Sequence, residues 1–215
     1  MSQNLCRWFS KNSKNTIKPN IPDLVQTMSE PVQVPVPVPK PRISNKRIIK
    51  VYTDGSTINN GKRAEVVSGG VGVYFGKNDG RNISKKVVSK KVTNNVCELM
   101  ACILAIEQVI KTEESMNLTQ INIYSDSEYT INSIVKWSDK WEKNNYKKKD
   151  KGKWVDVKNA IYIKKLREYY KQYNVKFFYT PAHTSQPDPR KDKEKYDQWY
   201  GNYMADYLAK CASQN

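Results

Sequence analysis

Apolar residues after about position 46 first recur with the spacing of β-strands. β-prone runs cover residues 48–52, 69–75 and 87–92. The segments between them carry Gly61 and Asn78-Asp79-Gly80, which favour hairpin turns. This pattern predicts three strands joined as hairpins.

The pattern then changes to the period of an amphipathic helix. Residues 96–110 carry an apolar stripe at i, i+3, i+4 and i+7. The remaining expected elements are a strand at 121–124, helices at 128–135 and 157–173, a strand at 175–178, and a C-terminal helix around 204–209. The order βββ-α-β-α-α-β-α predicts an α/β domain in which helices cover a mixed sheet.

The first 45 residues lack these periodic patterns. Residues 30–41 alternate Pro with Val, which excludes regular helix or sheet and favours an extended linker. Residues 1–22 contain basic residues and no Asp or Glu, with Leu5, Trp8 and Phe9 at helical spacing. An organelle transit peptide and a disordered basic tail that docks an unknown partner are both compatible with this segment. We therefore expect a tail at 1–45 and a single folded domain at 46–215.

Charge adds a partner class to this picture. The chain has 37 Lys and Arg against 21 Asp and Glu, a formal net charge of +16 at pH 7. Such an excess favours nucleic acid, because Lys and Arg displace counterions from phosphates. A solubilising surface, or the codon bias of an AT-rich genome, is the alternative explanation.

The cysteines and the hydropathy indicate where the chain works. No two of the four cysteines form a CxxC pair, and no apolar run approaches the roughly 18 residues of a membrane span. We expect reduced thiols in an intracellular compartment, no membrane contact and a monomer. The cysteines are Cys6, Cys97, Cys102 and Cys211.

Four carboxylates are the candidates for chemistry. Asp54 and Asp126 each follow a β-prone run and precede a small residue, and residues beyond strand ends face the crevice of an α/β sheet. Glu98 begins a helix with a face of small residues, and Asp206 follows Ala205 on the last helix. Converging carboxylates repel one another unless hard divalent cations bind between them, as in two-metal nucleases. Each acid alone also suits a turn, a cap or a helix dipole, so only the joint pattern carries weight.

The joint pattern resembles ribonuclease H, type 1. The motifs that carry the resemblance are Thr53-Asp54-Gly55-Ser56, Asn94-Asn95-Val96-Cys97-Glu98, Tyr124-Ser125-Asp126-Ser127 and Gly201-Asn202-Tyr203-Met204-Ala205-Asp206. The resemblance implies a five-stranded mixed sheet in the order 3-2-1-4-5. It also implies that the four carboxylates bind two Mg²⁺ ions, which Mn²⁺ can replace, and cut the RNA strand of RNA–DNA hybrids. The expected ends are a 5′-phosphate and a 3′-hydroxyl.

A basic, aromatic segment follows the third motif. Residues 136–165 carry eleven Lys against four acids, with three Trp interleaved. Cations that hold phosphates beside rings that pack on sugars or bases suit a nucleic-acid groove, whereas Trp137 and Trp141 at i, i+4 also suit a core-facing helix. The segment resembles the basic protrusion of cellular type 1 enzymes. By that resemblance Trp137, Trp141, Lys147 and Lys148 contact the DNA strand.

The resemblance also places contacts outside this segment. Lys91 and Thr93 fall where the family binds a DNA phosphate. Asn60, Asn94 and Asn95 fall where it contacts hybrid sugars and bases, including RNA 2′-hydroxyls.

The only histidine, His183, follows Tyr179-Thr180-Pro181-Ala182. This segment resembles the family's Pro-Gly-His motif, whose His assists proton transfer or product release. A charged insertion at residues 184–200 departs from the family pattern, and its role is left open between a lid, an extra substrate contact and a solvated loop.

Two rival functions share this fold. An integrase or transposase core usually has three acids and lacks the protrusion, and a non-catalytic binding module is expected to have lost a carboxylate. The presence of Asp206 and of the basic segment favours a hybrid-specific endoribonuclease.

Overall fold

A computed structural model describes residues 47–58, 67–89, 92–113 and 118–214. The expected tail, the turn at Gly61 and the contacts assigned to Asn60 and Lys91 lie outside these described residues. Among the helices of the described part, none is long and apolar enough to cross a membrane.

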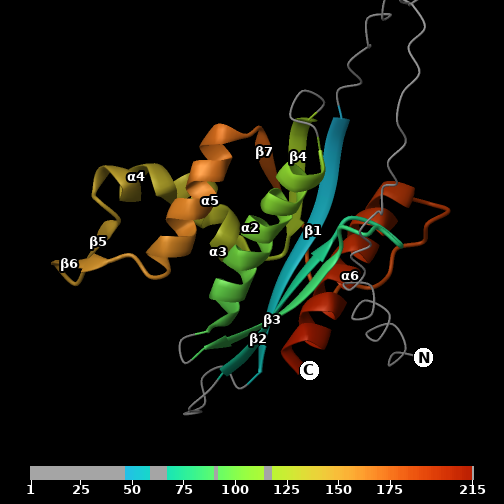
Figure 1. Ribbon diagram of the computed structural model, residues 1–215, viewed down its shortest axis with the longest axis horizontal. Helices are drawn as coiled ribbons and strands as arrows, with labels where there is room; N and C mark the ends of the chain where they lie inside the picture. The colour runs from blue at the N-terminus through green and yellow to red at the C-terminus, as the bar shows by residue number, and fades with distance from the viewer. Residues whose placement is uncertain (1–46, 59–66, 90–91, 114–117, 215) are drawn as a thin grey trace, which may run out of the picture. The chain divides into compact units, whose positions relative to one another are not determined.

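A five-stranded sheet forms the centre of the fold (Figure 1). Its strands are β1 (Arg47–Ile58), β2 (Val67–Tyr74), β3 (Ile83–Ser89), β4 (Leu118–Ser125) and β7 (Val175–Tyr179). They lie in the order β3-β2-β1-β4-β7, with β1, β2 and β3 antiparallel and β1, β4 and β7 parallel. Because β7 is the fifth strand of this sheet in chain order, the expected order 3-2-1-4-5 is confirmed.

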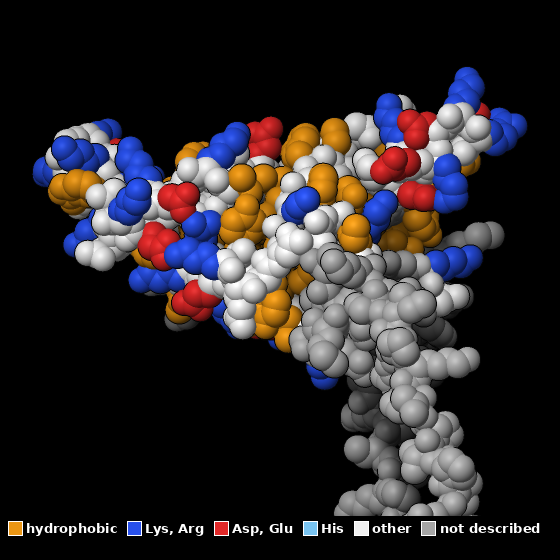
Figure 2. Space-filling model, turned by 90° about the horizontal axis from the view of Figure 1, so that it is seen from above, with side chains coloured by type: hydrophobic (Ala, Val, Ile, Leu, Met, Phe, Trp, Pro, Cys, Tyr) orange, Lys and Arg blue, Asp and Glu red, His pale blue; other side chains and the backbone are white. Residues whose placement is uncertain are grey.

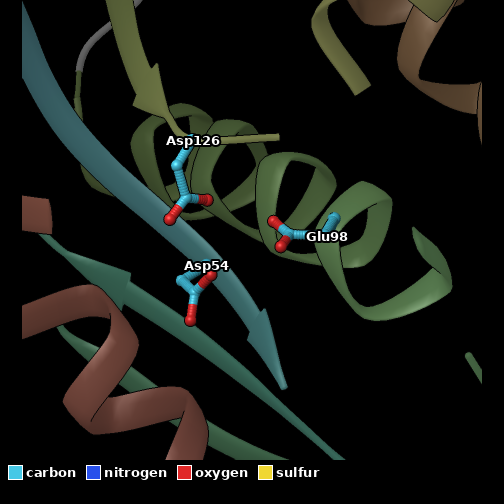
Figure 3. Close-up of side chains that lie close together, drawn as sticks. All are labelled: Asp54, Glu98 and Asp126. Carbon is cyan, nitrogen blue, oxygen red and sulfur yellow. The ribbon is translucent and has the colours of Figure 1, made fainter. Parts of the chain in front are cut away.

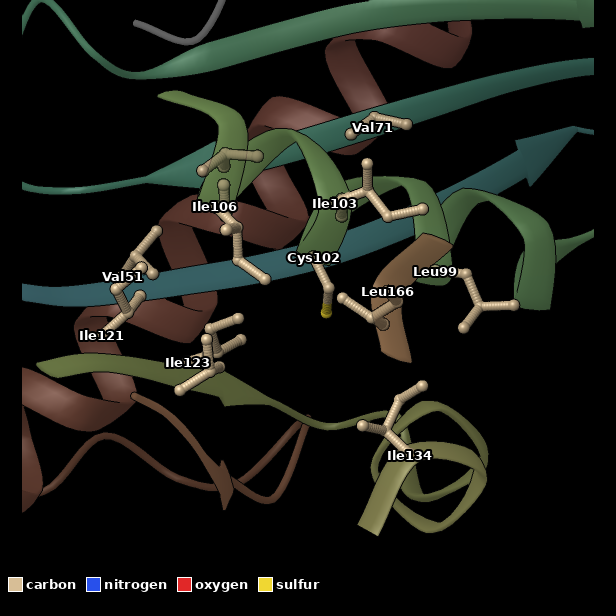
Figure 4. Packing of buried hydrophobic residues seen from close by; sticks show 14 of the residues in the cluster. Val51, Val71, Leu99, Cys102, Ile103, Ile106, Ile121, Ile123, Ile134 and Leu166 are labelled. Carbon is tan, nitrogen blue, oxygen red and sulfur yellow. The ribbon is translucent and has the colours of Figure 1, made fainter. Parts of the chain in front are cut away.

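Helices cover the sheet, as the sequence predicted, and they lie on both of its faces. The helices are α2 (Asn94–Thr112), α3 (Glu128–Asn132), α4 (Ser138–Lys143), α5 (Ala160–Gln172) and α6 (Lys193–Gln214), with a π-helical turn at Ser133–Trp137. Helix α6 packs across β1, β2 and β3 on one face, and α2 packs on β1 and β2 and against α5 on the other. Figure 4 shows the hydrophobic core on the α2 side, where Ile106 of α2 lies near Val51 of the sheet and Leu99 lies near Leu166 of α5.

Glycines on β2 let α6 lie unusually close to the sheet. A Cβ atom at Gly70 would lie 1.9 Å from the carbonyl oxygen of Ala209, and one at Gly72 would lie 2.0 Å from that of Ala205. Any side chain at these positions would push the helix away. The close approach places Asp206, the residue after Ala205, at the same level of the sheet as Asp54, which pairs with Gly72.

The structure corrects several boundaries. Strand β1 continues through Asp54 to Ile58. Residues 52–58 pair with β2, whereas the pairing of β1 with β4 ends at Tyr52 and Tyr124. Helix α6 begins at Lys193 within the insertion, earlier than the expected helix around 204–209, so Gly201 lies inside the helix. Gly201 is required there because a Cβ atom would lie 2.4 Å from the Tyr52 ring.

One further feature differs from the expectation. Strands β5 (Lys147–Asp150) and β6 (Lys153–Asp156) form a separate hairpin that the sequence pattern did not predict. Cys97 and Cys102 are buried free thiols, as expected.

Candidate active site

Two neighbouring strands and one helix bring three carboxylates together. Tyr52 of β1 and Tyr124 of β4 form the last parallel pair, so Asp54 and Asp126 both lie two residues beyond it. Glu98 reaches them from the first turns of α2 (Figure 3). Ligand atoms of the three side chains all lie within 4.8 Å of one another.

Gly55 explains how α2 approaches β1 so closely. A Cβ atom at this position would lie 2.3 Å from the backbone nitrogen of Glu98 and 2.5 Å from the carbonyl carbon of Cys97. The helix therefore packs directly on the strand backbone. Asp54 and Gly55 are part of a strand, and Gly55 permits the contact with the helix. An Asp-Gly pair is more commonly found in a turn.

Burial and mutual repulsion shape the electrostatics of this cluster. Burial, followed by the nearby charges of Asp126 and Asp206, raises the pKa of Asp54 to about 8. Burial and then the charges of Asp54 and Asp126 raise the pKa of Glu98 well above its usual range. The pKa of Asp126 is raised mainly by burial, against the opposing effects of a hydrogen bond from Asn202 and the charge of His183.

Two donors contact the cluster from neighbouring elements. Asn94 Nδ2 donates to Glu98 Oε1 at 3.5 Å, and Asn202 Nδ2 donates to Asp126 Oδ2 at 3.4 Å. The second oxygen of Glu98, Oε2, is buried and has no hydrogen-bond partner among the described residues. A buried acceptor of this kind is costly unless a ligand satisfies it, so the donor set fits a hard cation.

Asp206 lies at the edge of the cluster. It lines the same groove as the three carboxylates, but its carboxylate pairs with Lys210 Nζ at 2.7 Å, one helical turn further along α6. Asp206 is thus brought to the site without joining the group whose ligand atoms all lie within 4.8 Å.

The groove above these acids has a volume of about 480 Å³. Asn94 and Asn95 line it from the start of α2, and Thr93 caps that helix through a 3.4 Å hydrogen bond from Val96 N to its Oγ1. His183 lines the groove on an exposed loop, in a left-handed conformation with φ of 52°. The other lining residues are Gly55, Ser56, Ser127, Glu128, Tyr129 and Lys210.

A model of the RNase H family matches residues 46–214 of this chain. The chain belongs to the RNase H family.

Curated relatives agree with this membership. The chain is 38% identical over 160 residues to ribonuclease H of Schizosaccharomyces pombe, covering 74% of this chain and 51% of that protein. It is 36% identical over 143 residues to ribonuclease H of Clostridium botulinum (strain Hall), covering 65% of this chain and 85% of that protein. The chain thus spans about half the length of the S. pombe relative and nearly all of the bacterial one.

Solved structures share the fold of this RNase H family member. LC9-RNase H1, a type 1 RNase H with the type 2 active-site motif, superposes with a TM-score of 0.53 at 20% identity, covering 78% of this chain and 72% of that one. The solution structure of the PFV RNase H domain gives 0.53 at 20% identity, covering 77% and 94%. At this level of identity the likeness establishes the fold alone.

The basic segment forms a projecting lobe on this RNase H domain. It comprises the π-helical turn, α4 and the β5–β6 hairpin, and we call it the protrusion (residues 133–156; Figure 1). Figure 2 shows Lys and Arg side chains gathered on it. A hollow of about 740 Å³ on the protrusion is lined by Lys136, Trp137, Lys140, Trp141, Asn144, Lys147, Lys148, Lys149 and Trp154.

The two sequence-predicted tryptophans of the protrusion play different structural roles. Trp137 is 39% exposed, whereas Trp141 is partly buried against the hydrophobic core, and their rings lie 5.4 Å apart. The acids of α4 are turned toward α5, where Arg167 pairs with Asp139 and Lys171 pairs with Glu142 at 2.5 Å. The cations of the hollow therefore make its outer surface positively charged.

Sequence reasoning missed two groups that the structure places at the site. Asn202 was quoted within a motif but given no role, although it lies one turn before Asp206 on α6 and contacts Asp126. Trp199 and Tyr203 line a pocket beside Asp126 and Asp206. The spacing of four residues between Trp199 and Tyr203 could have indicated a shared helix face. Trp199 lies in the insertion and Tyr203 in the following motif, so the two were not considered together.

Proposed function

We propose that this RNase H family member is an endonuclease that hydrolyses the RNA strand of RNA–DNA hybrids, leaving 5′-phosphate and 3′-hydroxyl ends. The observation that carries the proposal is the cluster of Asp54, Glu98 and Asp126 at the floor of an open groove. Three converging carboxylates with raised pKa values seldom serve a structural purpose. Membership of the RNase H family supports a catalytic purpose for them.

Two Mg²⁺ ions are the proposed cofactors, with Mn²⁺ as a substitute. Oxygen ligands suit both ions, and Asp54, Glu98, Asp126 and Asp206 are the residues that would hold them. Bound divalent cations supply an activated water and stabilise the charge on the leaving oxygen. The unsatisfied Glu98 Oε2 and the 4.8 Å spread of ligand atoms support this donor set.

The chain's own residues divide the remaining work. Asp126 is held in place by the Asn202 amide, and Glu98 by the Asn94 amide. His183 stands at the exposed edge of the groove, and we assign it the movement of a proton during the cut or product release, because imidazole exchanges protons near neutral pH. The Lys210 ammonium pairs with Asp206, and both side chains line the groove.

The substrate assignment rests on the family name and on the groove. A foamy viral protease-reverse transcriptase with the same fold, at a TM-score of 0.53 and 18% identity, was solved in complex with an RNA/DNA hybrid. Asn94 and Asn95 line the groove beside the carboxylates, where we propose that they contact sugars and bases of the hybrid. Thr93 and Lys91 are assigned to a DNA phosphate, and Asn60 to the RNA strand.

The protrusion is the proposed grip on the DNA strand. Trp137, Trp141, Lys147 and Lys148 all line its hollow, which combines cations with exposed ring surface. Cations there hold phosphates and rings pack on sugars. We propose that the domain acts as a monomer inside the cell and that the segment at residues 1–45 binds a separate partner.

A cleavage assay on three duplexes tests this function. A labelled RNA strand is annealed to DNA or to RNA, and a labelled DNA duplex serves as the third substrate, each with Mg²⁺ or with EDTA. We expect cuts in the RNA of the hybrid with Mg²⁺ alone, and product ends that a polymerase can extend. Equal cutting of RNA–RNA, or cutting in EDTA, would contradict the proposal.

A further inference from the structure

A second pocket adjoins the carboxylate groove. It has a volume of about 380 Å³ and shares Asp126, His183 and Asp206 with the groove. Its remaining walls are not acidic: they are made by Trp199, Asn202 and Tyr203 of α6 and by residues 181–184 of the loop before it. One side of the pocket is therefore the reaction centre and the other side is aromatic, and we call it the aromatic pocket.

The insertion supplies one ring of the aromatic wall, Trp199, and braces it. The Trp199 and Tyr203 rings stack with centroids 5.5 Å apart and an interplanar angle of 12°. Trp199 Nε1 donates to the carbonyl oxygen of Thr184 at 3.0 Å, which fixes the ring against the loop. Tyr196 packs behind Trp199 at 5.9 Å. Tyr203 is 51% exposed, so its ring presents a surface to solvent, whereas the Trp199 ring is held in place against the loop.

A buried polar group points to a ligand in this pocket. Asn202 is 5% exposed and lines the pocket, and its Nδ2 donates to Asp126. A carboxylate accepts hydrogen bonds, so this contact fixes the amide orientation and leaves Oδ1 as the remaining acceptor. Asn202 Oδ1 has no hydrogen-bond partner among the described residues. A buried acceptor without a donor is costly, and a ligand hydroxyl would satisfy it.

The charges of the insertion argue against a phosphate grip. Residues 184–200 contain four basic and four acidic side chains, a net charge of zero. Several pair with one another: Arg190 with Asp188 at 3.1 Å and Lys193 with Asp197 at 2.5 Å. The insertion therefore contributes the Trp199 ring to the pocket and little net charge.

We propose that the aromatic pocket binds the ribose of an RNA-strand nucleotide next to the cut phosphate. Tyr203, braced by Trp199, packs on the apolar face of the sugar, and Asn202 Oδ1 accepts a hydrogen bond from its 2′-hydroxyl. A-form duplexes display riboses and 2′-hydroxyls in a shallow minor groove, where a wall beside the carboxylates can reach them. A deoxyribose would leave Asn202 Oδ1 unsatisfied. This assignment rests on the proposed hybrid cleavage and adds a specificity determinant to it.

The first test measures hybrid affinity with Ca²⁺ in place of Mg²⁺, over a time in which the RNA strand stays intact. We expect Tyr203→Ala to weaken binding about fivefold to tenfold, the lower end of aromatic packing on nucleotides. Tyr203→Phe keeps the ring and stays within about twofold of the parent. Tyr179→Ala removes a ring of matched exposure, 52%, that does not line the pocket, and it also stays at the parent value. Because the wall is uncharged, the loss is the same at low and at high salt.

The second test locates the contact on the RNA strand. A single 2′-O-methyl group, walked along the strand, removes one hydroxyl donor at a time. The parent is expected to lose affinity at the position beside the cut, and Tyr203→Ala is expected to lose the sensitivity at that position alone. Circular dichroism and thermal unfolding confirm that each variant is folded.

The outcomes separate the pocket from the function on which it rests. A parent that cuts the hybrid while Tyr203→Ala matches it in affinity and in the methyl profile overturns the pocket assignment alone. A loss that shrinks steeply with salt also overturns it, because that would indicate a phosphate contact. A parent that neither binds nor cuts the hybrid overturns both proposals.

Discussion

The carboxylate groove and the protrusion carry opposite charge and are built in opposite ways. The groove places acids on a buried sheet and a helix packed directly on its backbone, so Asp54 and Glu98 are 6% and 4% exposed. The protrusion places most of its lysines on and around a hairpin of two four-residue strands, and every residue of these strands is exposed. The groove thus depends on packing to hold charges that repel, whereas the protrusion depends on exposure to offer charges to a partner.

Glycine substitutions give the largest expected contrast between the two regions. Gly55→Ala would place a Cβ atom 2.3 Å from the Glu98 backbone, and overpacking of this kind costs about 3 kcal/mol. Gly152 in the hairpin has open space around it but a φ of 80°, so Gly152→Ala costs about 1 kcal/mol of local backbone strain. Denaturant unfolding measures both. Equal costs at the two positions would contradict the account of how α2 packs on β1.

The protrusion is tested by its salt dependence. Replacing Lys147, Lys148 and Lys149 with Ala is expected to weaken hybrid binding about tenfold or more at low salt. The slope of log affinity against log salt should fall by about one for each lysine that contacts a phosphate. The matched control replaces Lys191, Lys193 and Lys195 of the charge-balanced insertion, where we expect little change in slope. A slope that is the same in both triple variants would show that the protrusion is not the grip.

The groove is tested by the pH dependence of stability without divalent cations. Burial and neighbouring charge raise the folded-state pKa of Asp54 to about 8, so between about pH 4 and pH 8 the folded state binds more protons than the unfolded state. Stability therefore falls as pH rises through that window. Asp54→Asn should flatten the fall and stabilise the cation-free protein at pH 8 by about 1.4 kcal/mol or more, since one pKa unit corresponds to that energy.

Thermal unfolding in EDTA and in Mg²⁺ checks this prediction. Mg²⁺ should raise the melting temperature of the parent at pH 8 and have a smaller effect on Asp54→Asn, because a ligand of the folded state stabilises it. A parent whose cation-free stability rises between pH 5 and pH 8 would contradict the electrostatic account of the groove.

The groove was more predictable from sequence than the protrusion, for physical reasons. Asp54 and Asp126 follow apolar runs that form buried strands, so hydrophobic periodicity placed them correctly at one level of the sheet. The same periodicity ended β1 too early, because residues 55–58 pair with β2 without an apolar run of their own. Gly55 looked like a turn residue, and only the packing of α2 reveals its purpose.

The hairpin and the start of α6 escaped prediction for different reasons. Strands β5 and β6 are exposed on both faces, so no alternation of apolar and polar residues marks them. The segment at 193–200 does carry Tyr196, Trp199 and Tyr200 at helical spacing, but its surrounding charges resemble those of a solvated loop. The position of Asn202 beside Asp126 depends on how α6 lies on the sheet, which no local pattern encodes.

The most direct test of the central claim is hybrid cleavage by Asp126→Asn. This substitution keeps the size of a side chain that is only partly buried and removes one charged oxygen ligand from the cluster. Mg²⁺-dependent cleavage should fall by about a thousandfold or more, because a lost metal ligand removes several kcal/mol of transition-state stabilisation. Hybrid affinity should be largely preserved, because the protrusion is intact. Full cleavage activity in Asp126→Asn would contradict the assignment of these carboxylates to a two-metal centre.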